Sequence, residues 1–172
     1  MTRKSLAVVL LACGLIAQAA EKVVGGPYAV NVGPRSATVA WVVQTSEARL
    51  GTDPGELNRT APVLRVQKVS FTGLEAGATH HYDSFGEGGK GYFKTPPSGA
   101  VPFQFLVYGD TRSRHDVHAR VIQAMVKAGE PDFVIHTGDL VADGSDTAQW
   151  PVFFSIEREL LRKTAFFPCL GN

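Results

Sequence analysis

The sequence predicts an all-β sandwich in the N-terminal half, followed by the first part of an α/β domain of order βαβαβ. Before residue 96, short alternating runs are separated by turns rich in Gly, Pro and Asp, a pattern typical of antiparallel strands. After residue 101, runs that are apolar throughout alternate with helical patterns, which indicates βαβ units on a parallel sheet. These later apolar runs end in glycine followed by Asp or Asn, so oxygen-bearing side chains are expected at one sheet edge.

Composition limits the classes of partner. The chain has 172 residues and is 44% hydrophobic, enough for one or two small cores. Its 17 Lys and Arg nearly balance 16 Asp and Glu, so neither nucleic acid nor a charged membrane surface is expected as a partner.

Residues 1–19 have the pattern of a secretory signal peptide. Arg3 and Lys4 form its positive end, an apolar run covers residues 6–16, and Ala17-Gln18-Ala19 offers a cleavage site. Eleven apolar residues are too few to span a bilayer, which takes about 20, so no transmembrane segment is expected after the signal is removed. The sequence therefore predicts export to the periplasm or the extracellular space. A lipoprotein anchored through Cys13 is the alternative.

Residues 22–96 are expected to form the sandwich. In the run 38–43, Val39, Trp41 and Val43 share one face, as in a half-buried strand. Seven short strands are predicted, and turn residues separate most of them. They cover residues 28–32, 37–43, 48–50, 63–66, 69–74, 79–84 and 91–94.

Two segments of this half, 36–41 and 74–82, resemble a fibronectin type III-like module. That family normally has a tyrosine six residues after the leucine of the second segment, where this chain has His80, with Tyr82 following. Residues 97–101 are expected to be a short and fairly stiff linker, since the consecutive prolines Pro96 and Pro97 favour an extended chain.

The α/β half, residues 102–172, is predicted from periodicity. Its first helix has an apolar face with Ser113 as a possible cap, and the second helix should begin near Ser145 or Asp146. Cys169 lies in the last apolar run and is expected to be a buried core residue; with Cys13 in the signal, no disulfide is expected. The face of the first helix is expected to comprise Val117, Val121, Ile122, Met125 and Val126.

Asp110, Asp139 and Asn172 follow the three apolar runs and are each preceded by glycine. The separations of 29 and 33 residues each correspond to about one βαβ step, so the three side chains should meet at the carboxyl edge of the sheet. A carboxylate shared between two cations can hold them about 3.5–4 Å apart, an arrangement that activates water and neutralises a phosphate ester.

The segments 108–112, 138–141 and 171–172 resemble the start of the calcineurin-like metallophosphoesterase domain, and with the sandwich the chain resembles secreted purple acid phosphatase-type proteins. The resemblance implies two metal ions of the Mn, Zn or Fe class and a phosphate ester substrate. It implies that Asp110 binds the first metal, Asp139 bridges both and Asn172 binds the second. Arg112 stands where many members have a ligand histidine, and Ala142 stands where an iron-binding tyrosine would be, so an iron–tyrosinate centre is not expected.

Several neighbouring side chains have two interpretations. Arg112 is either a catalytic residue that grips a phosphate oxygen or a surface residue that pairs with Asp116. His115 and His118 are either surface groups or substitutes for the missing ligand. His136 is expected to be a hydrogen-bonded core residue, and Asp143 and Asp146 to be turn or cap residues.

The leading functional hypothesis is an exported, metal-dependent phosphoric ester hydrolase. The resemblance implies further histidines after Asn172, so the chain would supply three of roughly seven or eight ligands for two metals and would be a weakly active or inactive fragment. A secreted β-sandwich binding or adhesion module with a non-catalytic α/β remnant is the alternative.

Overall fold

The structure is a computed structural model that describes residues 21–86 and 88–172. The predicted signal peptide and Cys13 lie outside the described residues. Of the helices in the described ranges, none has the length and apolar character needed to cross a membrane.

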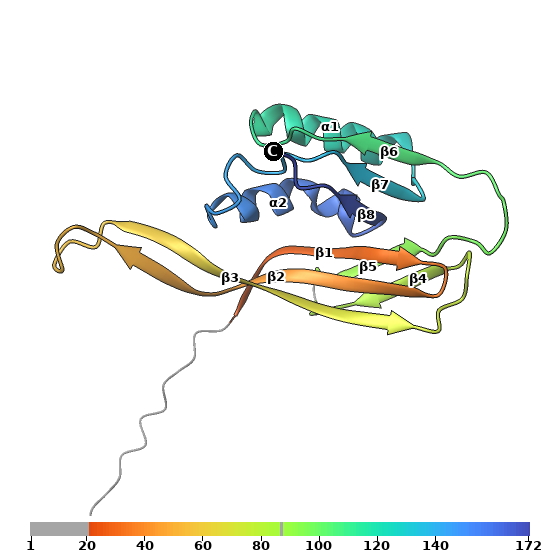
Figure 1. Cartoon of the computed structure of the whole chain (residues 1–172), viewed down its shortest axis with the longest axis horizontal. Coiled ribbons are helices and arrows are strands. Elements are labelled where there is room, and N and C mark those ends of the chain that lie inside the picture. Colours follow the sequence, from red (N-terminus) through yellow and green to blue (C-terminus); the bar gives the residue numbers. More distant parts are fainter. Residues whose placement is uncertain (1–20, 87) are drawn as a thin grey trace, which may run out of the picture.

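The first half begins with a three-stranded antiparallel arrangement of β1 (Lys22–Gly33), β2 (Ser36–Leu50) and β3 (Arg59–Thr72). The strands are fewer and longer than predicted, because β2 and β3 each join two of the predicted short strands. Their pairing runs from Ser36 opposite Thr72 to Leu50 opposite Arg59, with one irregularity between Gln44 and Ser46. A bulge absorbs an extra residue without ending the strand, so β2 continues through the gap between the strands predicted at 37–43 and 48–50. Figure 1 shows this long hairpin extending beyond the rest of the molecule.

A second, two-stranded sheet consists of β4 (Thr79–Asp83) and β5 (Lys90–Lys94). Phe93 of β5 is buried in a cluster with Ala29 and Val39, and Tyr82 of β4 packs against the same cluster. The β4–β5 pair thus forms a small second layer over β1 and β2. The fibronectin type III-like sandwich stays a prediction.

The second half has the predicted order of elements: β6 (Phe105–Tyr108), α1 (His115–Ala128), β7 (Phe133–His136), α2 (Gln149–Leu161) and β8 (Ala165–Pro168). The three strands are parallel, with β7 between β6 and β8. Ala165 of β8 also pairs with Ala29 of β1, so the two halves contribute to one mixed sheet of order β3-β2-β1-β8-β7-β6.

The faces of the parallel strands differ in burial. Successive right-handed crossovers in one direction place α1 and α2 on the same face of the sheet. The inward-facing Val134 and Phe166 are buried there, whereas Phe105, Val107 and Phe167 face away from the helices and are exposed. Cys169 lies two residues after Phe167, so it continues the side that faces away from the helices, and it lies beyond the end of β8. It is therefore exposed, and the prediction of a buried core residue is wrong.

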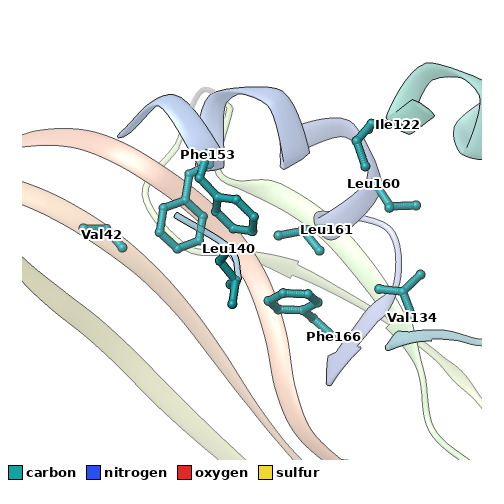
Figure 2. Packing of buried hydrophobic residues seen from close by; sticks show 9 residues of the cluster. Val42, Ile122, Val134, Leu140, Phe153, Leu160, Leu161 and Phe166 are labelled. Atoms are coloured by element: carbon teal, nitrogen blue, oxygen red, sulfur yellow. The ribbon is translucent and has the colours of Figure 1, made fainter. Parts of the chain in front are cut away.

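The largest hydrophobic cluster takes residues from both sides of the 97–101 segment. Val42 of β2 belongs to it together with Phe153 of α2 and Phe166 of β8 (Figure 2). β1 and α2 can pack in one cluster because they approach closely at Gly25, where an added Cβ would lie 2.6 Å from the Phe154 ring. The Phe154 ring stacks on Tyr28 of β1 at a centroid distance of 5.3 Å. The carboxyl ends of β6, β7 and β8 therefore sit on a shared core.

Candidate functional site

Backbone hydrogen bonds extend the parallel pairing past the ends of the strands. The Asp110 N–H donates to the Gly138 carbonyl over 3.0 Å, and the Asp139 N–H donates to the Leu170 carbonyl over 3.1 Å. The Thr111 N–H donates to the Asp139 carbonyl over 3.0 Å. These bonds hold the segments after β6, β7 and β8 side by side, so the polar residues that follow the strands lie at one edge.

Asp110 and Asp139 share an uncommon backbone conformation. Their φ angles are +54° and +57°, in the left-handed region that residues other than glycine rarely adopt. The preceding glycines are required for space: a Cβ at Gly109 would lie 2.0 Å from the Thr137 hydroxyl, and one at Gly138 would lie 2.5 Å from the Gly171 Cα. Both aspartates are thus held by the same local geometry at equivalent strand ends.

Arg112 contacts both carboxylates at once. Its Nε lies 3.1 Å from Asp110 Oδ1, and its Nη1 lies 3.1 Å from Asp139 Oδ2. The interpretation of Arg112 as the partner of Asp116 is wrong, since Asp116 pairs with Arg114 and Arg120 instead.

Asn172 approaches Asp139 from the end of the third strand. Its backbone N–H donates to Asp139 Oδ1 over 3.1 Å. With the amide nitrogen turned toward the carboxylate, as the surrounding hydrogen-bond donors and acceptors require, its side chain donates over 3.2 and 3.3 Å. The side chain of Asp139 is only 16% exposed, whereas that of Asp110 is 73% exposed. Asp139 is therefore the fixed member of the corner that Asp110, Arg112, Asp139 and Asn172 form.

His136 supports this corner from inside the sheet. It is fully buried, and its Nδ1 accepts a hydrogen bond from the Gly138 N–H over 3.1 Å. The proton is then on Nε2, which donates to the Thr111 hydroxyl over 3.0 Å, and that hydroxyl donates to the Leu140 carbonyl over 3.1 Å. Burial, together with nearby His118, lowers the pKa of His136 to about 4, which Asp139 opposes only in part. As predicted, His136 is a hydrogen-bonded core residue.

His118 is neither a surface group nor a substitute for the missing metal ligand. It is buried, and its Nε2 lies 2.7 Å from Glu157 Oε1 of α2. The Tyr108 hydroxyl donates to the other oxygen of Glu157 over 2.7 Å. Burial, followed by the effect of the Glu157 charge, raises the pKa of Tyr108 above its ordinary value.

The buried Glu157 was missed by the sequence interpretation, although its position carries a signal. It lies three and four residues from Phe153, Phe154, Leu160 and Leu161, in the middle of the apolar stripe of α2. A carboxylate in such a stripe needs a buried partner, and His118 on α1 provides it.

The remaining polar candidates lie in turns. Asp143 accepts hydrogen bonds from the Ser145 backbone and hydroxyl, and Asp146 accepts one from the Ala148 N–H, which confirms them as turn residues. Both helices begin later than predicted. Arg114, and not Ser113, is the N-cap residue of α1. Ala148 is the N-cap residue of α2.

A divalent cation fits the corner by the chemistry of its donors. Carboxylate and amide oxygens suit hard ions such as Mg²⁺ and Mn²⁺. The carboxylates of Asp110 and Asp139 already converge on a cationic group, the Arg112 guanidinium. Within residues 21–86 and 88–172, no group of three or more His, Cys, Asp and Glu side chains is placed to hold a metal ion, so the corner has only two ionisable ligands. The oxygen donors of the corner are thus the two carboxylates; Asn172 presents its amide nitrogen to Asp139 and would offer its oxygen to a metal ion only after the amide turns over.

Comparison with protein families gives one match. Residues 103–172 match the calcineurin-like phosphoesterase family. The matched region spans β6 to β8 and contains Asp110, Asp139 and Asn172. No curated protein matches the chain. The family match indicates a metal-dependent phosphoester hydrolase domain in this part of the chain, with phosphate esters as the class of substrate.

Proposed function

We propose that this chain is an exported, metal-dependent phosphoester hydrolase whose metal ions are held by Asp110, Asp139 and Asn172. The observation that supports the proposal is that the Asp110 and Asp139 carboxylates meet at Arg112 and that Asn172 donates to Asp139, at equivalent strand ends within the region matched to the phosphoesterase family. Asp139, whose carboxylate is mostly buried, would hold the ions together with Asp110 and Asn172.

The metal ions, of the Mn, Zn or Fe class, would activate water for attack on phosphorus. The residues of the chain hold and orient the site. The left-handed backbone at Asp110 and Asp139 sets the two carboxylates, and the His136–Thr111–Leu140 hydrogen bonds fix the segments that carry them. Arg112 would bind a phosphate oxygen once its guanidinium is released from the carboxylates.

The rate of turnover is expected to be low. The corner offers two carboxylates, both paired with Arg112, and an amide that presents its nitrogen to Asp139, which is fewer oxygen donors than two ions need. A low occupancy by metal follows from both facts.

Hydrolysis of p-nitrophenyl phosphate and of its bis ester by the purified chain, with and without Mn²⁺, tests the proposal. We expect slow release of nitrophenol that requires Mn²⁺ and falls at least about tenfold in Asp139→Asn, since Asp139 is the shared ligand. Asp116→Asn is the matched control, because it removes the same charge from an exposed helix position. Equal rates in the wild type and Asp139→Asn would contradict the proposal, and rapid turnover would contradict the expected low occupancy.

Export is a separate part of the proposal and rests on the sequence of residues 1–19. The mass of the chain recovered from a secreting host distinguishes cleavage after Ala19 from lipidation at Cys13. Recovery of the intact chain in the cytoplasm would contradict export.

One observation bears on the alternative of a binding module. A groove of about 490 Å³ lies between β1 and α2, and its lining contains Lys22, Phe85, Phe154 and Arg158 but not the residues of the corner. A sandwich-based binding protein would use such a hollow. A ligand whose affinity changes in Arg158→Gln and not in Asp139→Asn would favour that alternative.

A further inference from the structure

Arg112 bridges two carboxylates in the way a bound cation does. Its Nε and Nη1 contact different partners, Asp110 and Asp139, each over 3.1 Å. The carboxylates belong to segments that follow different strands, β6 and β7, so the contact joins two strand ends across the site edge.

The charges of the corner explain why a cation is needed there. Two negative carboxylates held near the same position repel each other unless a positive charge lies between them. The Arg112 guanidinium offsets one of the two negative charges, and the Asn172 N–H donates to Asp139 as well. A divalent ion at the same place would offset both charges and would be repelled by the guanidinium.

We propose that Arg112 is a built-in competitor of the metal: its guanidinium occupies the cation position between Asp110 and Asp139, and a divalent ion binds only after the side chain turns out. This inference rests on the metal corner of the proposed function but not on hydrolysis. The side chain of Arg112 is 45% exposed, so it reaches solvent without disturbing the core. Asp139 stays in place during the exchange, because Asn172 donates to it independently of Arg112.

The shape of the guanidinium suits this role better than a simple positive charge. Its donors point in fixed directions and reach two acceptors at once, whereas an ammonium group is a compact point charge on a flexible stem. Arg112→Lys should therefore keep the charge but lose one of the two contacts. Arg112→Gln should lose both the charge and most of the contact.

The test measures Mn²⁺ binding and thermal unfolding of the full chain. Free Mn²⁺ is followed by its electron paramagnetic resonance signal during titration, and the melting temperature is measured in EDTA and in Mn²⁺. The variants are Arg112→Gln, Arg112→Lys and Arg114→Gln. The last is the matched control, because Arg114 lies two residues away and pairs with Asp116 rather than with the corner.

We expect the dissociation constant for Mn²⁺ to fall about tenfold or more in Arg112→Gln, to fall less in Arg112→Lys, and to be unchanged in Arg114→Gln. In EDTA, Arg112→Gln should melt below the wild type, and adding Asp139→Asn should reverse part of that loss by removing the repelling charge. Equal affinity in the wild type and Arg112→Gln would overturn the proposal. So would an Arg112→Gln variant that melts like the wild type in EDTA.

Two results keep this inference separate from the proposed function. If Arg112→Gln gains Mn²⁺ affinity and none of the proteins hydrolyses a phosphate ester, the competition stands and the hydrolase proposal falls. If Arg112→Gln does not fold, the comparison of Arg112→Lys with Arg114→Gln decides, and equal Mn²⁺ affinity in those two overturns the competition.

Discussion

The buried imidazole of His136 donates a hydrogen bond to the hydroxyl of Thr111 over 3.0 Å, which ties the end of β7 to the segment after β6. Thr111 directly follows Asp110, and Gly138, which donates to the same imidazole, directly precedes Asp139. The relative position of the two carboxylates therefore depends on a hydrogen-bond chain beneath them.

Thr111→Val should destabilise the fold by about 1–3 kcal/mol, because it leaves His136 Nε2 and the Leu140 carbonyl buried without a partner. Urea unfolding followed by circular dichroism measures the effect. Thr137→Val is the control, since that hydroxyl is exposed and makes one long contact of 3.3 Å. Equal urea midpoints for the two variants would show that the hydrogen bonds of Thr111 beneath the corner do not stabilise the fold.

The stability of the fold should decrease as the pH falls from about 6.5 to about 4. The folded protein holds the pKa of His136 at about 4, below its ordinary 6.5, so in this range the unfolded state binds more protons. The contribution is fully present above pH 6.5 and is lost by pH 4, and it amounts to about 3 kcal/mol. Asp132, whose pKa is lowered mainly by its hydrogen bond to Lys94, loses its contribution only below about 3.8.

Denaturant unfolding at a series of pH values, compared between the wild type and His136→Gln, isolates the contribution of His136 to the free energy of unfolding. The slope between pH 4 and 6.5 should be smaller in the variant. Parallel slopes would mean that another group produces the dependence.

Glu157→Ala should destabilise the protein by about 3–5 kcal/mol, because it leaves Tyr108 and His118 buried without their shared acceptor. Glu159→Ala, two residues away on an exposed part of α2 and paired with Arg162, should have an effect below about 1 kcal/mol. Thermal unfolding of both variants checks the difference. A similar loss of stability in both variants would mean that the substitutions act through the helix and not through the buried contacts of Glu157.

The outer face of the parallel sheet should bind hydrophobic dyes and promote association. Phe103 and Phe105 are 61% and 46% exposed, and both stack on Phe133. Phe105→Thr should lower the fluorescence of bound anilinonaphthalene sulfonate and the light scattering of concentrated solutions. Val152→Thr, at a similarly exposed position on α2, should change neither. Unchanged fluorescence in Phe105→Thr would contradict this assignment.

The βαβαβ order could be predicted because each of its signals is local. Fully apolar strands, helical periodicity and spacings of 29 and 33 residues are visible without knowledge of neighbours. The same spacings predicted that Asp110, Asp139 and Asn172 would meet, because parallel strands separated by one helix end at the same edge.

The errors concern contacts between distant elements. The exposure of Cys169 depends on which face of the sheet the helices cover, and the pairing of His118 with Glu157 depends on how α1 packs on α2. The extent of β2 depends on its partner β3, which continues past the bulge. None of these follows from periodicity along one segment.

The most direct test of the corner is an anomalous difference map from crystals of the Arg112→Gln variant soaked in Mn²⁺. We predict a peak in contact with the carboxylates of Asp110 and Asp139, at the position that the guanidinium occupies in the wild type. A map with Mn²⁺ bound elsewhere, and with those carboxylates free of metal, would contradict the assignment of this edge as the metal site of a phosphoester hydrolase.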